Sequence, residues 1–211
     1  MRGNIKMKKK IENYKRRELF EHYDNFTKPF ASVTTKIDVT AVYELSRQKG
    51  HFYAIFGYCL TKAMCEIEEF RVTYEAREFY LHDTIVPSYT EVLNDGTIGF
   101  FDVPLKDTLE EYLASYDETR ISLLNGETLT YSADAVVWLS CEPWFKASAI
   151  DPPFDKNTRI PQMIWDKYEK VGELYYVDLL IFFHHGFADG QHLGRLISAI
   201  NENIANLKNI L

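Results

Sequence analysis

Two apolar segments place the strongest constraint on the fold of this 211-residue chain. Asp134–Cys141 and Leu174–Phe183 are dense in valine, leucine, isoleucine and aromatic residues, a composition that is typical of buried strands. The longest apolar run, Tyr175–Phe183, is interrupted by Asp178 and is far too short to cross a bilayer, so we expect no transmembrane helix. The sequence therefore predicts a buried sheet inside a globular domain.

Helices and further strands intermingle around these two segments. Apolar residues at helical spacing predict helices over Arg16–Phe26, Thr40–Lys49, Ala54–Glu68, Leu105–Leu124 and His192–Leu211. Alternation and a turn signal predict further strands at Ser32–Val39, Phe79–His82, Ser88–Leu93 and Ile98–Val103. We expect Asp38 or Thr40 to cap the second helix, and a loop with several prolines from Pro143 to Pro161. This order predicts an α/β or α+β fold with a mixed sheet.

The charge of the chain is unevenly distributed. Residues 1–17 carry eight basic side chains and one acidic one, whereas residues 18–211 carry 16 basic and 30 acidic ones, which together give the net charge of −7. Such an acidic body argues against nucleic acid as the main partner, because phosphate binding needs a contiguous basic face. The basic start lacks the apolar segment of a secretory signal, so we interpret residues 1–13 as a solvated leader before a single domain at residues 14–211.

The cysteines favour a reducing compartment. Cys59, Cys65 and Cys141 are odd in number, lie in apolar surroundings and lack paired spacings, so the sequence predicts no disulfide framework. We therefore expect buried, reduced thiols and a cytoplasmic location.

A histidine-rich stretch follows the second buried strand and leads into the last helix. His185, Asp189 and His192 recur at positions i, i+4 and i+7, which on a continuous helix would form a metal-binding face. Gly186 and Gly190 interrupt such a helix, and the spacing matches no established zinc signature, so we expect no metal here. Two interpretations remain, namely structural histidines at the end of a strand, or a histidine general base that titrates near neutrality.

The same stretch resembles a known family. His184-His185-x-x-x-Asp189-Gly190 matches the HHxxxDG signature of the classical chloramphenicol acetyltransferases, which are distinct from the hexapeptide type. Other segments similar to this family recur in order along the chain: Tyr14 to Tyr23, Lys36 to Thr40, Phe52-Tyr53, Glu69 to Arg71, Pro87 to Thr90, Ser140 to Trp144, and Pro161 to Tyr168. The resemblance extends over residues 14–205.

The resemblance implies a fold and an activity. We expect a two-layer α/β sandwich with a mixed sheet, the fold of CoA-dependent acyltransferases, and a homotrimer with each site between two subunits. The implied reaction transfers acetyl from acetyl-CoA to a hydroxyl of chloramphenicol or a related alcohol, an activity associated with antibiotic resistance. By the resemblance, His185 is the general base and Ser140 stabilises the oxyanion, whereas His184 is structural.

The resemblance also assigns supporting and binding residues. Asp189 and Arg16 match a family ion pair that fixes the turn carrying the base, and we expect no direct chemical role for them. Lys167 and Tyr168 match positions near the adenosine end of coenzyme A. His51 stands where the family often has a lysine near the 3′-phosphate.

The predicted acceptor pocket departs from the family. Tyr23 is retained, and Ile164 replaces a threonine of the family. The family pocket is more aromatic and apolar at the positions of Ile150, Pro152 and Gln162. We therefore expect chloramphenicol to be acetylated with a high KM, and the Gln162 amide to be buried without a partner. The alternatives are an acetyltransferase for another small-molecule alcohol and a non-catalytic trimeric binding relative.

Overall fold

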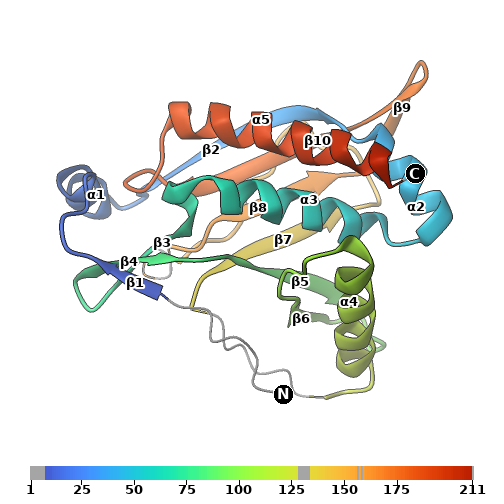
Figure 1. Ribbon diagram of the computed structural model, residues 1–211, viewed down its shortest axis with the longest axis horizontal. Helices are drawn as coiled ribbons and strands as arrows, with labels where there is room; N and C mark the ends of the chain where they lie inside the picture. Colours follow the sequence, from blue (N-terminus) through green and yellow to red (C-terminus); the bar gives the residue numbers. More distant parts are fainter. Residues whose placement is uncertain (1–7, 128–133, 156, 158, 211) are drawn as a thin grey trace.

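A mixed seven-stranded sheet forms the centre of the protein (Figure 1). The computed structural model describes residues 8–127, 134–155, 157 and 159–210, so residues 1–7 of the predicted leader and Leu211 of the predicted last helix lie outside the described residues. The strands of this sheet are β2 (Phe30–Asp38), β5 (Val86–Val92), β6 (Ile98–Asp102), β7 (Val136–Glu142), β8 (Gln162–Asp166), β9 (Glu169–Val171) and β10 (Leu174–His184).

The strand order is β2-β10-β8-β7-β5-β6, with β9 also paired to β10. The pairs β5–β7 and β7–β8 are parallel, and the other pairs are antiparallel. Every second residue of the central strands is buried in the main core, including Leu139, Met163 and Ile181. The intervening residues, such as Ser140 and Ile164, therefore lie on the other face of the sheet.

Helices cover the core face, so the molecule has two layers (Figure 1). The helices that pack into this core are α2 (Thr40–Lys49), α3 (Phe52–Glu66), α4 (Leu109–Leu124) and α5 (Gly190–Asn206). The helix α1 (Arg17–Asp24) lies to one side (Figure 1), where its Phe20 is buried in a second, smaller cluster. Short 3-10 helices lie at Glu68–Arg71 and Leu207–Asn209. α3 and α5 pack side by side over the sheet. This arrangement confirms the prediction of a two-layer α/β fold with a mixed sheet. None of the helices in the described ranges is long and apolar enough to cross a bilayer.

Local hydrogen bonds give α4 a later start than predicted, whereas α2 has its predicted bounds but not its predicted cap. α4 begins four residues late because Thr108 and Glu111 form a capping box at its start. The predicted cap of α2 is wrong, because the residue that precedes the helix is Val39. The Asp38 carboxylate instead accepts the N–H of Thr40, the first residue inside the helix, at 2.9 Å.

The structure also differs from the prediction at the start of the chain. A second, three-stranded sheet has the order β1-β4-β3 and consists of β1 (Lys8–Ile11), β3 (Val72–Glu75) and β4 (Glu78–His82). Part of the expected solvated leader is thus a strand. Lys8 Nζ lies 2.8 Å from Glu75 and 3.1 Å from Asp134. This lysine of the predicted solvated leader therefore forms ion pairs with two acidic residues of the folded domain.

Candidate active site

The turn between β10 and α5 holds the histidine pair. β10 ends at His184, and α5 begins at Gly190 because the Asp189 side chain accepts a main-chain N–H of the first helical turn at 3.0 Å. The main chain of His185 is fixed at the edge of the sheet, where its N–H donates to the carbonyl of Pro29 at 2.9 Å. The turn therefore presents the two neighbouring rings in one defined arrangement.

The His185 ring is held with one nitrogen free to accept a proton. Its Nδ1 lies 3.0 Å from the carbonyl oxygen of Ala188. A carbonyl only accepts, so Nδ1 carries the hydrogen in the neutral ring and Nε2 keeps its lone pair. The ring stacks on Tyr23 of α1 with a centroid distance of 4.3 Å and an interplanar angle of 26°. A fixed ring with a free Nε2 is what a general base needs.

The neighbouring His184 has the opposite arrangement. Its side chain is fully buried, and its Nδ1 accepts the Gly186 N–H at 3.1 Å, so in the neutral ring the hydrogen lies on Nε2. Nε2 faces an oxygen of Asp24 at 3.3 Å, without the alignment of a full hydrogen bond. Burial lowers the pKa of His184 to about 4, so the ring is neutral at pH 7. This geometry favours a structural role.

Asp189 joins the turn to the N-terminal segment. Its Oδ2 lies 2.8 Å from Nη1 of Arg16, whose Nε also donates to the Gly186 carbonyl at 3.2 Å. Its Oδ1 lies 2.8 Å from Nδ1 of His192. Burial opposes the ionisation of Asp189, but the hydrogen bonds from Arg16 and His192 outweigh it and lower the pKa of Asp189 to about 2. The carboxylate thus connects the turn to two other parts of the chain.

His192 lies between two carboxylates. Its Nδ1 contacts Asp189, and its Nε2 lies 3.1 Å from Glu69. Across the part of the chain that the structure describes, no three His, Cys, Asp or Glu side chains are arranged as a set of metal ligands.

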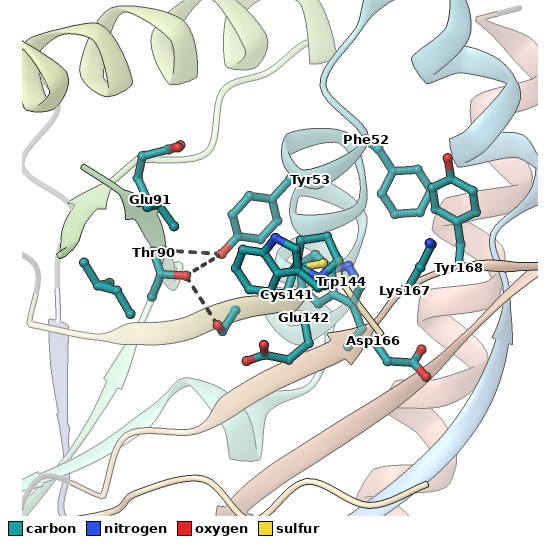
Figure 2. A pocket seen from close by; sticks show the side chains of 15 residues that line it. Phe52, Tyr53, Thr90, Glu91, Cys141, Glu142, Trp144, Asp166, Lys167 and Tyr168 are labelled. Atoms are coloured by element: carbon teal, nitrogen blue, oxygen red, sulfur yellow. Dashed lines mark hydrogen bonds between the residues drawn. The ribbon is translucent and has the colours of Figure 1, made fainter. Parts of the chain in front are cut away.

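A cavity of about 560 Å³ opens around Ser140 on β7 (Figure 2). Ser140 Oγ lies 3.3 Å from Oγ1 of Thr90 on the adjacent strand β5. Figure 2 shows Thr90 at one end of the cavity and Lys167 and Tyr168 at the other, with Trp144 between them. The Trp144 side chain is 66% exposed, so part of the cavity wall is open to solvent. A concave site with aromatic walls and a few polar groups is typical of small-molecule binding.

His51 lies outside the lining of this cavity. It precedes α3, and its Nε2 lies 3.3 Å from Oδ2 of Asp117 on α4. An acidic side chain therefore lies next to the ring for which the resemblance predicts a phosphate contact.

Two of the residues predicted for the acceptor pocket lie on β8, a strand that the sequence pattern does not indicate. Gln162 and Ile164 are buried there, and Ile164 pairs with Ser140 of the neighbouring strand. Ile150 is partly buried in the loop before β8. The expectation that the Gln162 amide lacks a partner is wrong, because its Nε2 donates to the Pro153 carbonyl at 2.7 Å.

His185 and Ser140 lie at distant points of a single chain. Ser140 pairs with Ile164, which pairs with Leu180, five residues before His185 along β10. Two strand spacings of ~4.8 Å and five residue rises of ~3.3 Å separate the two backbones by roughly 20 Å. His185 is also not among the residues that line the Ser140 cavity. One chain therefore does not bring both side chains to the same reacting atom.

An ion pair without a sequence signal connects the loop before β8 to α1. The Nε and Nη2 atoms of Arg159 each lie 2.8 Å from a carboxylate oxygen of Asp24. This is the same carboxylate that faces His184. The two residues are 135 positions apart in the sequence, so no local spacing indicates the pair.

Comparison with known proteins gives consistent matches. A family model described as chloramphenicol acetyltransferase matches residues 6–201. The chain is 28% identical over 203 residues to a chloramphenicol acetyltransferase of Staphylococcus aureus, which covers 91% of this chain and 92% of the relative. It is 26% identical over 200 residues to a chloramphenicol acetyltransferase of Clostridium perfringens, with 91% and 95% coverage.

Solved structures share the fold. A chloramphenicol acetyltransferase superposes with a TM-score of 0.81 at 21% identity, covering 94% of this chain and 100% of that one. A probable dihydrolipoamide acetyltransferase from Listeria monocytogenes gives a TM-score of 0.67 at 15% identity, with 94% and 95% coverage. At these identities the likeness concerns the fold alone.

Proposed function

The chain belongs to the chloramphenicol acetyltransferase family, and from this premise we propose that it transfers the acetyl group of acetyl-CoA to a hydroxyl of chloramphenicol or a related small alcohol. His185 acts as the general base and Ser140 as the oxyanion donor, in a site that two subunits form together. The observation that carries the proposal is the contact between His185 Nδ1 and the Ala188 carbonyl, which leaves Nε2 as a fixed base.

Family membership makes the chain an acyltransferase. The predicted resemblance and the prediction of an enzyme are thereby confirmed, and the alternative of a non-catalytic binding relative loses its support. The remaining details of the reaction belong to the proposal.

In the proposed reaction, His185 Nε2 takes the proton of the acceptor hydroxyl while the oxygen attacks the thioester carbonyl. A carbon–oxygen bond forms, and the former carbonyl oxygen becomes an oxyanion that accepts the hydrogen of Ser140. Collapse of this intermediate breaks the carbon–sulfur bond, and the leaving thiolate takes the proton from the His185 imidazolium. The products are the acetyl ester and coenzyme A, and His185 returns to its neutral form.

The Ser140 cavity is the proposed binding site for the co-substrate acetyl-CoA. The thioester end lies beside Ser140, because its carbonyl must reach the serine hydroxyl. At the other end, Lys167 provides a cation for a phosphate and Tyr168 provides an aromatic surface for the adenine. His51 contributes less than a lysine, because it attracts a phosphate only when it is protonated and Asp117 competes for its Nε2.

The separation of roughly 20 Å between the backbones of His185 and Ser140 supports a site shared by two copies of the chain. A closed ring of three copies, each presenting His185 to the Ser140 cavity of the next, has three such sites. Ile98 and Phe100 on β6 are 61% and 51% exposed and alternate with the buried core residues, which supports burial of this sheet face against another copy. We therefore assign a homotrimer to the active enzyme.

An alcohol other than chloramphenicol is the second candidate acceptor. Gln162 on β8 favours this second candidate. Its buried amide, which is hydrogen-bonded to Pro153, makes β8 polar at the predicted wall of the acceptor pocket. We assign a cytoplasmic location because Cys59, Cys65 and Cys141 are free thiols. Acetylation of chloramphenicol in that compartment would give antibiotic resistance.

A thiol-release assay with acetyl-CoA and a panel of alcohols tests the proposed function. We expect release of coenzyme A with chloramphenicol, with a KM well above the micromolar range. Turnover of another alcohol but not of millimolar chloramphenicol would move the assignment to the second candidate. No release with any alcohol would overturn the proposal.

A further inference from the structure

A series of hydrogen bonds connects the Ser140 hydroxyl through Thr90 to Tyr53 at the start of α3, and Figure 2 shows the part of it between Thr90 and Tyr53. The parallel register of β5 and β7 places Tyr89 beside Leu139, so the next residues, Thr90 and Ser140, are neighbours on the opposite face of the sheet. Thr90 Oγ1 lies 3.3 Å from Ser140 Oγ and 3.2 Å from the hydroxyl of Tyr53. Thr90 is thus the link between the serine and the tyrosine.

The Tyr53 hydroxyl fixes the direction of this series. It donates its single hydrogen to the Leu139 carbonyl at 2.7 Å, because a carbonyl only accepts. Burial raises the pKa of Tyr53, so the hydrogen stays on the oxygen at neutral pH. The tyrosine oxygen then accepts the main-chain N–H of Thr90 at 3.3 Å. Towards Thr90, Tyr53 is therefore an acceptor.

Thr90 has two ways to place its own hydroxyl hydrogen. When the hydrogen points to Tyr53, Thr90 accepts from Ser140 and the serine hydrogen is engaged. When the hydrogen points to Ser140, the serine oxygen accepts it, and the serine hydrogen is free to turn into the cavity. Each arrangement gives the hydrogen of the part-buried Thr90 hydroxyl an acceptor, so the exchange does not leave it unsatisfied.

We propose that Thr90 is a positioning residue for acetyl transfer, which holds Ser140 in place and releases the serine hydrogen to the oxyanion. The inference rests on the proposed function, in which Ser140 stabilises that oxyanion. No covalent bond to Thr90 forms or breaks. Its hydrogen rotates from the Tyr53 oxygen to the Ser140 oxygen as the serine hydrogen turns towards the substrate, and the β-branched side chain restricts the rotation of Thr90 itself.

A double-mutant cycle with Ser140 tests this inference in the full-length enzyme. Thr90→Val keeps the shape of the side chain but removes the hydroxyl, and we expect kcat to fall about tenfold, with both KM values within about twofold. Thr90→Ser keeps a hydroxyl and retains most of the kcat. In the Ser140→Ala background, Thr90→Val causes no further loss, because the hydrogen bond that it removes is already absent.

Thr61→Val is the matched control. Thr61 is a buried threonine of α3 whose hydroxyl donates to the carbonyl of Gly57 in its own helix, so the same change leaves kcat unaltered. An unchanged kcat in Thr90→Val, or an equal loss with and without Ser140, would overturn the positioning role while leaving the proposed function intact. Absence of acetyl transfer in the unmodified enzyme would overturn the proposed function and this inference with it.

Discussion

The two ends of the proposed site are built in different ways. At the base end, the turn between β10 and α5 has partners within the chain for both His185 and Asp189. At the serine end, Ser140 lies in a cavity of about 560 Å³ whose wall includes the exposed Trp144. The base end is complete in one chain, whereas the serine end is open.

This difference separates two kinds of effect. Substitutions in the turn break contacts that hold the fold together, so they change stability as well as rate. Substitutions around Ser140 remove few internal contacts, so they change the rate with little change in stability. In the proposed enzyme, the two ends meet only when two copies of the chain associate.

Replacement of His185, the proposed base, gives the largest expected effect. His185→Ala lowers kcat by about 10³-fold or more, because no other side chain takes the proton of the acceptor, and acetyl-CoA binding stays nearly unchanged. Steady-state kinetics and calorimetric binding of acetyl-CoA measure the two effects. His184→Ala is the neighbouring control and mainly lowers the melting temperature, because His184 is buried. If His192→Ala were equally inactive and the unmodified protein contained bound zinc, a metal-dependent mechanism would replace the proposed general base.

At the serine end, Ser140→Ala lowers kcat by about 10²-fold, the usual cost of one preorganised oxyanion donor. Both KM values and the melting temperature change little, since the Ser140 side chain contacts Thr90 by one long hydrogen bond. Kinetics and thermal melting of the same preparation check this. A change that appears mainly in KM would show that Ser140 binds the ground state instead.

Asp189→Asn is expected to lower both stability and rate. It leaves the part-buried Arg16 guanidinium without a carboxylate, at a cost of roughly 3 kcal/mol of unfolding free energy, the lower end of the usual range because the pair is partly exposed. Urea unfolding and steady-state kinetics measure the two losses. A variant that unfolds like the wild type but has no turnover would indicate a direct chemical role for Asp189.

The same ion pair predicts a pH dependence of stability. The pKa of Asp189 in the folded protein is about 2, below its ordinary value of 3.8, so folding favours the ionised carboxylate. Its contribution is complete above the ordinary value and is lost as the pH falls through about 2. The difference in urea midpoint between wild type and Asp189→Asn should therefore be constant at neutral pH and shrink in acid. A difference that grows in acid would contradict the assigned ion pair.

The smallest expected effect concerns the acceptor wall. Gln162→Ile makes the wall more apolar, but it also removes the donor to the Pro153 carbonyl. We expect the KM for chloramphenicol to fall only about twofold, with a loss of about 1 kcal/mol in unfolding free energy. A tenfold gain in affinity at unchanged stability would show that this hydrogen bond has no role.

The sequence predicts best those elements whose signal is local. The helix at Phe52–Glu66 and the strand at Leu174–His184 lie within two residues of their predicted bounds, because their apolar patterns reflect direct burial. The strand at Gln162–Asp166 was missed, because it is buried in full, carries polar residues at both ends and follows a proline-containing loop. The strand at Lys8–Ile11 has no apolar alternation in its sequence, because three of its four residues are lysines.

The candidate site divides in the same way. The HHxxxDG signature identifies His185 and Asp189 as candidate site residues, because both belong to one turn and are therefore close in sequence. The pairing of Asp24 with Arg159, and of Thr90 with Ser140, depends on strand register and loop packing across many residues. No single-sequence pattern contains that information.

Complementation between two inactive variants is the most direct test of a site that two subunits share. In the proposed homotrimer, coexpressed His185→Ala and Ser140→Ala chains would mix, and some interfaces would combine an intact His185 from one chain with an intact Ser140 from the next. With random assembly at equal amounts, about a quarter of the sites have both residues, so we predict recovery of about a quarter of the wild-type activity. Activity that stays at the level of the separate variants would show that the two residues do not meet across an interface.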